Sequence, residues 1–153
     1  MAKVEAFVKE ISAHHNVMMD TNAIIYFLDG TPNLIDLMMA LFEMVERGQL
    51  KVTLSVINEA ELLVKPYQEN NSAAREAINF FLEEFPNLNV VPLNREISQQ
   101  AAKIRAESGL RMPDAIILAT AISNQCDLFL GNDLILMHKA SLYLPTVVLN
   151  DYI

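Results

Sequence analysis

The sequence predicts an α/β fold in which helices pack on a five-stranded parallel sheet. Five short runs of β-branched or apolar residues alternate with longer segments of helical periodicity, and this alternation is typical of β-α-β units around a parallel sheet. The chain has 153 residues, of which 52% are hydrophobic. That length and composition suit one domain with a single buried core.

The expected strands are short and bounded by polar or turn-forming residues. In chain order they cover residues 16–20, 50–54, 89–93, 127–131 and 146–150. Because a helical segment or a long connection separates each strand from the next, all five are expected to run parallel.

An amphipathic helix is expected before the first strand. Apolar residues recur there at helical spacing, namely Val4, Phe7, Val8 and Ile11. We treat residues 1–15 as an N-terminal helical extension and residues 16–153 as the main domain. The apolar stripe has to be buried either on its own domain or on a second chain, and the sequence leaves both possibilities open.

Local end signals predict the remaining helices, because Ser, Thr and Asn cap helix starts, Pro suits the first turn and Gly often follows the last. By these signals helices cover residues 32–48, 56–64, 72–85 and 95–109, and another begins at Pro113. The helix opened by Ser55 is expected to stop before Pro66, since proline disfavours helical geometry in the preceding residue.

Composition excludes several classes of protein. The formal net charge of −8 argues against a protein that holds nucleic acid mainly through a basic surface. The single cysteine, Cys126, can form neither an internal disulfide nor a cysteine-based zinc site. No apolar run reaches the roughly 18 to 20 uncharged residues of a membrane span, and the start lacks the apolar core of a signal peptide. We therefore expect a soluble, cytoplasmic protein.

Acidic residues stand near the expected carboxyl ends of the strands, where open α/β sheets bind ligands. Asp20 ends the first strand, and Asp133 follows the fourth. Glu61 lies in the helix after the second strand, and Asp114 lies in the first turn of a later helix. These four side chains account for half of the net negative charge.

Each aspartate has a simpler explanation on its own, because an aspartate at a strand-to-helix junction often caps the helix. Glu61 fits that explanation less well. It lies beyond the first turn between Ala60 and Leu62, and a carboxylate in an apolar setting normally has a partner or a metal. Four converging carboxylates would repel one another unless a cation were present. Oxygen ligands suit Mg²⁺ or Mn²⁺ and argue against zinc.

These acids lie in four short segments of the chain. They are Asp20-Thr21-Asn22, the stretch from Ser55 to Leu62 with Glu61 near its end, Met112-Pro113-Asp114-Ala115 with its apolar continuation to Ala121, and Gly131-Asn132-Asp133. Together they resemble the four acidic motifs of PIN domains, and in particular the VapC-type toxin ribonucleases. The resemblance covers the chain from about Asn16 onward.

The resemblance implies a three-layer α/β/α sandwich and a pocket that holds one or two Mg²⁺ or Mn²⁺ ions. It also implies ribonuclease activity, with Asp20, Glu61, Asp114 and Asp133 as the catalytic metal ligands. Glu59 competes for the second position, but the register favours Glu61, and a helix would turn Glu59 elsewhere. One position departs from the family, because many relatives have Thr or Ser where this chain has Gly131. Activity could therefore be weakened or altered.

The chemistry expected from these residues is metal-assisted hydrolysis of an RNA phosphodiester bond. Polar or basic residues near the acids are candidates to contact the RNA, namely Asn22, Lys103, Arg105 and Arg111. The last three serve equally well as ordinary surface charges. The expected protein partners are an antitoxin, whose arginine could neutralise the pocket, and a second copy of the chain in a homodimer.

Three other functions are compatible with parts of the sequence to different degrees. A PIN fold without catalysis could serve as an interaction module, which the net acidity and Gly131 would suit. A phosphotransferase of the haloacid dehalogenase type also begins with a strand ending in aspartate, but it expects a second aspartate where this chain has Asn22. A dinucleotide-binding enzyme would need a Gly-x-Gly-x-x-Gly motif after the first strand, which is absent.

Overall fold

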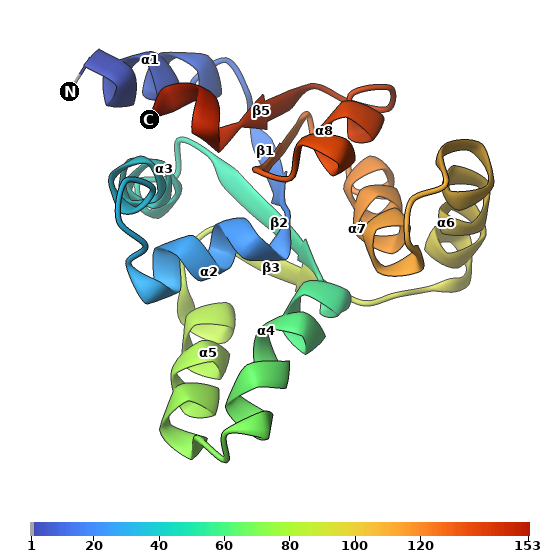
Figure 1. Cartoon of the computed structure of the whole chain (residues 1–153), viewed down its shortest axis with the longest axis horizontal. Coiled ribbons are helices and arrows are strands. Elements are labelled where there is room, and N and C mark those ends of the chain that lie inside the picture. Colours follow the sequence, from blue (N-terminus) through green and yellow to red (C-terminus); the bar gives the residue numbers. More distant parts are fainter. Residues whose placement is uncertain (1) are drawn as a thin grey trace.

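A five-stranded, all-parallel sheet forms the centre of the computed structural model, which describes residues 2–153 (Figure 1). The strands are β1 (Asn16–Met19), β2 (Lys51–Ser55), β3 (Leu88–Val91), β4 (Leu128–Gly131) and β5 (Thr146–Val148). Their spatial order is β3-β2-β1-β4-β5, and every neighbouring pair is parallel. The predicted sheet is confirmed.

Helices cover both faces of the sheet (Figure 1). In chain order they are α1 (Ala2–Ile11), α2 (Thr21–Asp29), α3 (Ile35–Glu46), α4 (Val56–Gln68), α5 (Ser72–Glu84), α6 (Arg95–Ser108), α7 (Met112–Ser123), α8 (Leu134–Ala140) and the short 3₁₀ turn η1 (Leu149–Tyr152). Helices α2 and α3 lie on one side of the sheet, and α6 and α7 on the other. The predicted three-layer α/β/α architecture is therefore correct.

The two central strands carry the core. All four residues of β1 and of β4 are buried, as expected for parallel strands covered on both faces. The large side chains that fill this core include Met18, Met19 and Phe129. Burial on both faces fixes the strand ends firmly, and residues that follow β1 and β4 are held next to each other.

Some helix ends follow the predicted signals. The Asn94 side chain accepts a hydrogen bond from the Ile97 N–H at 2.9 Å and caps α6. Gly109, with φ of +74°, ends the same helix in the left-handed region that glycine adopts without strain. Capping by Asn and Gly was therefore predictable from local chemistry alone.

Other predicted helix ends were wrong. Helix α3 begins at Ile35 instead of Pro32, because Asn33 has a positive φ of 69° that helical backbone cannot accommodate. Helix α4 runs through Pro66 to Gln68, although it was expected to stop earlier. Pro66 is buried, so packing of its ring offsets the hydrogen bond that proline removes. Helices α2 and α8 were not predicted, and residues 149–150 belong to η1 rather than to the last strand.

The apolar stripe of α1 is buried on its own chain. Phe7 and Ile11 are completely buried, and the Phe7 ring packs edge-on against Tyr152, with 5.5 Å between the ring centroids. The helix lies beside α3 and the C-terminal turn (Figure 1). Burial within the same chain is therefore observed for Phe7 and Ile11, whereas Val4 and Val8 are half-buried.

Within the described residues, no helix is both long enough and apolar enough to cross a bilayer.

Candidate functional site

The candidate site lies at the point where the chain connections leave the sheet in opposite directions. Strands β1 and β4 are neighbours, but β1 connects onward to β2 on one side and β4 to β5 on the other. The loops after these two strands diverge and leave room for a ligand at their carboxyl ends. Asp20 follows β1 directly, and its N–H donates to the Leu130 carbonyl at 2.9 Å.

Asp20 is buried in a negatively charged environment. Only 8% of the residue is exposed. The pKa of Asp20 is raised from 3.8 to about 6, first by burial and then by the negative charges of Asp114, Glu61 and Asp133. The structure thus brings the four predicted acids close enough for three of them to act on the fourth.

Glu61 accepts a hydrogen bond from the first residue of α2, Thr21. The Thr21 Oγ1 donates a hydrogen bond to Glu61 Oε1 at 2.6 Å. No hydrogen bond or ion pair of the competing Glu59 side chain is found among the described residues, and Glu59 does not contribute to the pKa of Asp20. Glu61 is the glutamate of α4 that joins the acidic group.

Within residues 2–153, Asp114 is the one acid of the four that forms an ion pair. It lies in the first turn of α7, and Arg111 Nη2 stands 3.2 Å from its Oδ2. The Asp114 side chain is 12% exposed, whereas the Arg111 side chain is 78% exposed. Arg111 therefore covers Asp114 from the solvent side.

Asp133 performs the capping role that was the simpler explanation for it. Its Oδ1 accepts hydrogen bonds from the N–H groups of Ile135 and Leu136 at 3.0 and 3.1 Å, which caps α8. Its Oδ2 has no hydrogen-bond partner among residues 2–153. The two explanations are compatible, because the cap uses only one of the two oxygens.

Gly131 leaves no room for the side chain that many relatives carry. A Cβ added there would lie 2.9 Å from Met137 Sδ and 3.1 Å from Asp20 Cβ. The Met137 side chain, which is 2% exposed, thus fills the space beside Asp20. The departure from the family pattern is accompanied by a methionine in the same volume.

The predicted RNA-contacting residues do not form one group. Asn22 is exposed on α2, two residues after Asp20. Arg105 donates through Nη1 to the Leu110 carbonyl at 2.6 Å and so stabilises the turn between α6 and α7. Lys103 is exposed on α6. Only Arg111 contacts one of the four acids directly.

Sequence reasoning missed Asn58. This residue is completely buried, and its side-chain amide contacts Ser55, Met19 and Thr21. A polar residue three positions after a capping serine is a recognisable signal, and here it forms a capping box with Ser55. The contacts to β1 could not have been found without the structure.

The acidic group has the donor chemistry of a site for a hard cation. All its donors are carboxylate oxygens, and such donors fit Mg²⁺ or Mn²⁺. Among residues 2–153, however, no three His, Cys, Asp or Glu side chains are arranged as a ready-made metal cage. Ionised carboxylates repel one another, and a bound cation would remove that repulsion.

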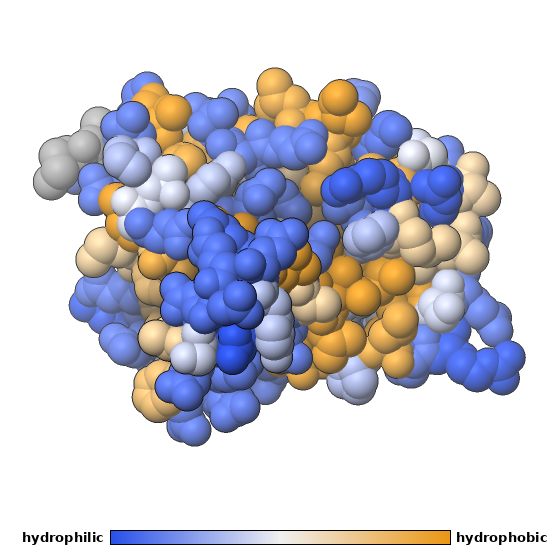
Figure 2. Space-filling model, turned by 60° about the horizontal axis from the view of Figure 1, so that its bottom comes forward, coloured by the Kyte–Doolittle hydropathy of each residue, from blue (hydrophilic) through white to orange (hydrophobic). Residues whose placement is uncertain are grey.

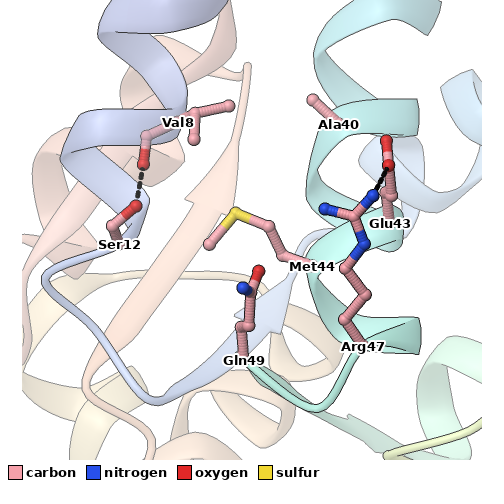
Figure 3. Close-up of a pocket in the computed structure, with 7 residues that line it drawn as sticks. All are labelled: Val8, Ser12, Ala40, Glu43, Met44, Arg47 and Gln49. Atoms are coloured by element: carbon pink, nitrogen blue, oxygen red, sulfur yellow. Dashed lines mark hydrogen bonds and ion pairs between the residues drawn. The ribbon is translucent and has the colours of Figure 1, made fainter.

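A pocket lies away from the four acids, between α1 and α3. The pocket has a volume of about 490 Å³. Figure 3 shows residues that line it, among them Val8, Met44 and Gln49. Its charged residues are already paired, since Arg47 contacts Glu43 within α3. None of the four acids lines it.

An α/β/α sandwich with carboxylates gathered beyond its two central strands defines a class of acidic-site α/β domains. Within that class the chain belongs to the PIN domain family, whose pattern matches residues 17–141. No curated protein matches the chain.

Several solved structures share the fold. VapBC2 from Rickettsia felis, bound to a promoter DNA fragment, has a TM-score of 0.69 at 16% identity and covers 87% of this chain and 98% of its own. FitAcB from Neisseria gonorrhoeae has a TM-score of 0.65 at 20% identity, covering 87% and 97%. A toxin–antitoxin complex from Klebsiella pneumoniae has a TM-score of 0.60 at 23% identity, with the same coverage of 87% and 97%.

Proposed function

We propose that this PIN domain is an Mg²⁺- or Mn²⁺-dependent endoribonuclease, and that it is the toxin of a VapBC-type toxin–antitoxin pair. The observation that carries the proposal is the environment of Asp20. Burial first, and three further carboxylates second, raise the pKa of its carboxyl group to about 6. A fold retains such repulsion at a functional site, and a divalent cation would convert it into attraction.

The four acids would have different roles in metal binding. Asp20 and Asp114 would hold the principal ion, and Glu61 would complete its ligand set or orient the attacking water. Asp133 Oδ2, which the helix cap leaves free, would hold a second or weaker ion. When bound, a divalent ion lowers the pKa of a water and neutralises negative charge on the phosphate.

RNA would be bound mainly by residues on the solvent side of the acids. Arg111 is exposed next to Asp114 and could donate to a phosphate oxygen. Asn22 and Lys103 are exposed and available, whereas Arg105 has one guanidinium nitrogen engaged in the α6–α7 turn. We therefore expect Arg111 to matter most among these residues. Such a substrate would be met in the cytoplasm.

An antitoxin has a suitable surface beside the acids. A groove of about 340 Å³ between α2, α4 and α5 begins at Glu61. Its lining is apolar at Ile25, Leu28, Leu62, Pro66 and Ile78, and acidic at Asp29, Glu61 and Glu69. Lys65 is the single cation of this lining. An apolar lining with an acidic rim suits a peptide that carries apolar and basic side chains better than it suits RNA phosphates.

The proposed homodimer no longer depends on α1, whose apolar stripe is buried in its own chain. Other apolar side chains remain exposed, among them Val64 at 51% and Met112 at 43%. Figure 2 looks at the molecule from the side of the α4–α5 hairpin, where hydrophilic side chains predominate on the hairpin itself and apolar side chains gather beside it. We propose this face as the dimer contact. Light scattering should then give a dimer that Val64→Glu dissociates, whereas Met39→Glu on α3 leaves it intact.

Cleavage of RNA in the presence of Mn²⁺ tests the enzymatic proposal. Asp20→Asn and Asp114→Asn should each reduce cleavage by at least about 10²-fold, because each removes a charged ligand. Asp127→Asn, at the opposite end of the sheet, is the matched control and should cleave normally. Glu61→Gln should impair cleavage far more than Glu59→Gln.

The alternative function makes a different prediction. An interaction module without catalysis would cleave no RNA under any metal condition, yet would co-purify with a basic partner. Equal cleavage by the wild type and Asp20→Asn would show that the nuclease activity, if any, does not depend on this site.

A further inference from the structure

We propose that Asn58 and Thr21 form a hydrogen-bond relay that fixes the position of Glu61 relative to Asp20. In this relay both residues are positioning residues, because they act on the site only through Glu61. The inference rests on the proposed function of the four acids and adds to it two residues outside the acidic set.

The first link of the relay is the side-chain amide of Asn58. Its Oδ1 accepts a hydrogen bond from the Ser55 N–H at 2.8 Å. Its Nδ2 donates to the Met19 carbonyl at 3.2 Å and to Thr21 Oγ1 at 3.0 Å. A carbonyl can only accept, and a backbone N–H can only donate, so the amide of Asn58 fits in one orientation alone.

The second link follows from the single proton of a hydroxyl group. Thr21 Oγ1 accepts from Asn58, so its own proton is free to be donated. The acceptor is Glu61 Oε1, at 2.6 Å. Thr21 is 6% exposed, so little water competes for this contact. The direction of every hydrogen bond in the relay is therefore determined by its neighbours.

The relay ties two elements of the site together. It begins at the carbonyl of Met19, one residue before Asp20, and ends on Glu61, which belongs to α4. A glutamate has three rotatable bonds, and without the relay it would lose more conformational freedom when it binds an ion. With Oε1 engaged by Thr21, Oε2 has both lone pairs available for a cation, and the carboxylate is held in register with the end of β1.

A purely structural role for Asn58 would explain only one of its three side-chain hydrogen bonds. The capping box with Ser55 accounts for the contact through Oδ1. It does not require the two contacts through Nδ2, which cross to β1 and to the first residue of α2. Those two contacts have a common result, which is the orientation of the Thr21 hydroxyl toward Glu61.

The test compares Thr21→Val with Thr21→Ser in the full-length protein. Thr21→Val keeps the shape but removes the hydroxyl, and we expect Mn²⁺ affinity to fall about 10-fold, as for other groups that orient metal ligands. The turnover number for RNA should fall in parallel while KM for RNA is unchanged. Thr21→Ser should restore both quantities. Mn²⁺ binding is measured by calorimetry and by the paramagnetic resonance of free Mn²⁺.

Thr53→Val is the matched control. Thr53 is also buried, at 4% exposure, and its hydroxyl also donates to a side chain, the Asn16 Oδ1 at 2.8 Å. It lies within β2, away from the four acids. Thr53→Val should lower thermal stability as Thr21→Val does, but leave Mn²⁺ affinity unchanged.

A double variant shows whether the effect passes through Glu61. In the Glu61→Gln background, Thr21→Val should cause no further loss of Mn²⁺ affinity. Unchanged Mn²⁺ affinity in folded Thr21→Val, or an additional 10-fold loss in the double variant, would overturn the relay while leaving the nuclease proposal intact. A wild-type protein that neither binds Mn²⁺ nor cleaves RNA would overturn both.

Discussion

Two aspartates at opposite ends of the central strands have opposite environments. Asp20 follows the carboxyl end of β1, where burial first and neighbouring carboxylates second raise its pKa to about 6. Asp127 precedes the amino end of β4 and accepts hydrogen bonds from the N–H groups of His15 and Asn16 at 3.0 and 2.9 Å. Burial opposes ionisation there too, but those hydrogen bonds and the charge of His14 lower the pKa of Asp127.

The difference shows that Asp127 stabilises the fold, whereas Asp20 does not and must be retained for a reason other than stability. Asp127 is surrounded by donors and holds the α1–β1 connection against β4. Asp20 is surrounded by like charges, and its ionised form destabilises the folded protein. The edge of the sheet at Asp127 is stabilised by hydrogen bonds, whereas the edge at Asp20 is destabilised by like charges, and we call the latter the strained edge. Substitutions at the two edges should therefore change stability in opposite directions.

The largest expected effect is the stabilisation of the metal-free protein by Asp20→Asn. The folded-state pKa of about 6 lies above the ordinary aspartate pKa of 3.8, so the folded state binds the proton more tightly than the unfolded state. Wild-type stability should therefore fall as pH rises from about 4 to about 6 and stay low above that. The shift corresponds to about 3 kcal/mol in the free energy of unfolding at pH 8.

Urea unfolding in a chelating buffer at pH 4.5 and pH 8 measures this effect. The wild type should lose stability between the two pH values relative to Asp20→Asn, and Mn²⁺ should return that stability at pH 8 to the wild type only. A wild type that is as stable as Asp20→Asn at both pH values would contradict the strained edge.

The next effect has the opposite sign. Asp127→Asn removes charge-assisted hydrogen bonds to two backbone N–H groups and should destabilise the protein by about 1 to 2 kcal/mol at neutral pH. Because the folded-state pKa is lowered, the contribution of Asp127 is complete above the ordinary aspartate pKa of 3.8 and is lost as pH falls further. Thermal melting at pH 7 and pH 3 checks this. The melting temperatures of the wild type and Asp127→Asn should be more similar at the lower pH.

This comparison also explains what the sequence could and could not predict. Strand ends follow from short apolar runs, so Asp20 and Asp133 could be placed at the carboxyl edge from local pattern alone. Asp127 was placed only inside a strand, because its partners, His15 and Asn16, are more than a hundred residues away in the chain. Contacts across that separation depend on strand order, which the sequence pattern does not specify.

Packing overrode local signals at two further places. Pro66 reads locally as a helix end, but its burial lets α4 continue to Gln68. Arg105 reads as a candidate for RNA contact, but it is the residue that holds the α6–α7 turn through the Leu110 carbonyl. In both cases the deciding partner is fixed by the final arrangement of the helices.

A smaller effect is expected where the strained edge is most tightly packed. Gly131→Ala places a Cβ 2.9 Å from Met137 Sδ and 3.1 Å from Asp20 Cβ, which is closer than ordinary contacts allow. The methionine is flexible, so we expect a cost near the low end of overpacking, about 1 kcal/mol. In a Met137→Val background the same substitution should cost less, and a double-mutant cycle by urea unfolding measures the coupling. Equal costs in both backgrounds would mean that Met137 does not fill the space left by Gly131.

The smallest effect on stability is expected for Arg111→Ala, although its effects on binding should be the most informative about the strained edge. Arg111 is the cation beside Asp114, and its side chain is 78% exposed, so its loss should change the free energy of unfolding by less than about 1 kcal/mol.

The same guanidinium competes with an incoming ion for the Asp114 carboxylate. Mn²⁺ affinity should therefore rise in Arg111→Ala, by no more than about five-fold, while RNA is bound more weakly. Calorimetric titration with Mn²⁺ and the KM for RNA measure the two quantities separately, and Arg111→Lys should lie between the alanine variant and the wild type in both. Weaker Mn²⁺ binding in Arg111→Ala would instead mean that Arg111 supports the metal-binding position of Asp114, so that the carboxyl edge needs its one cation even when an ion is bound.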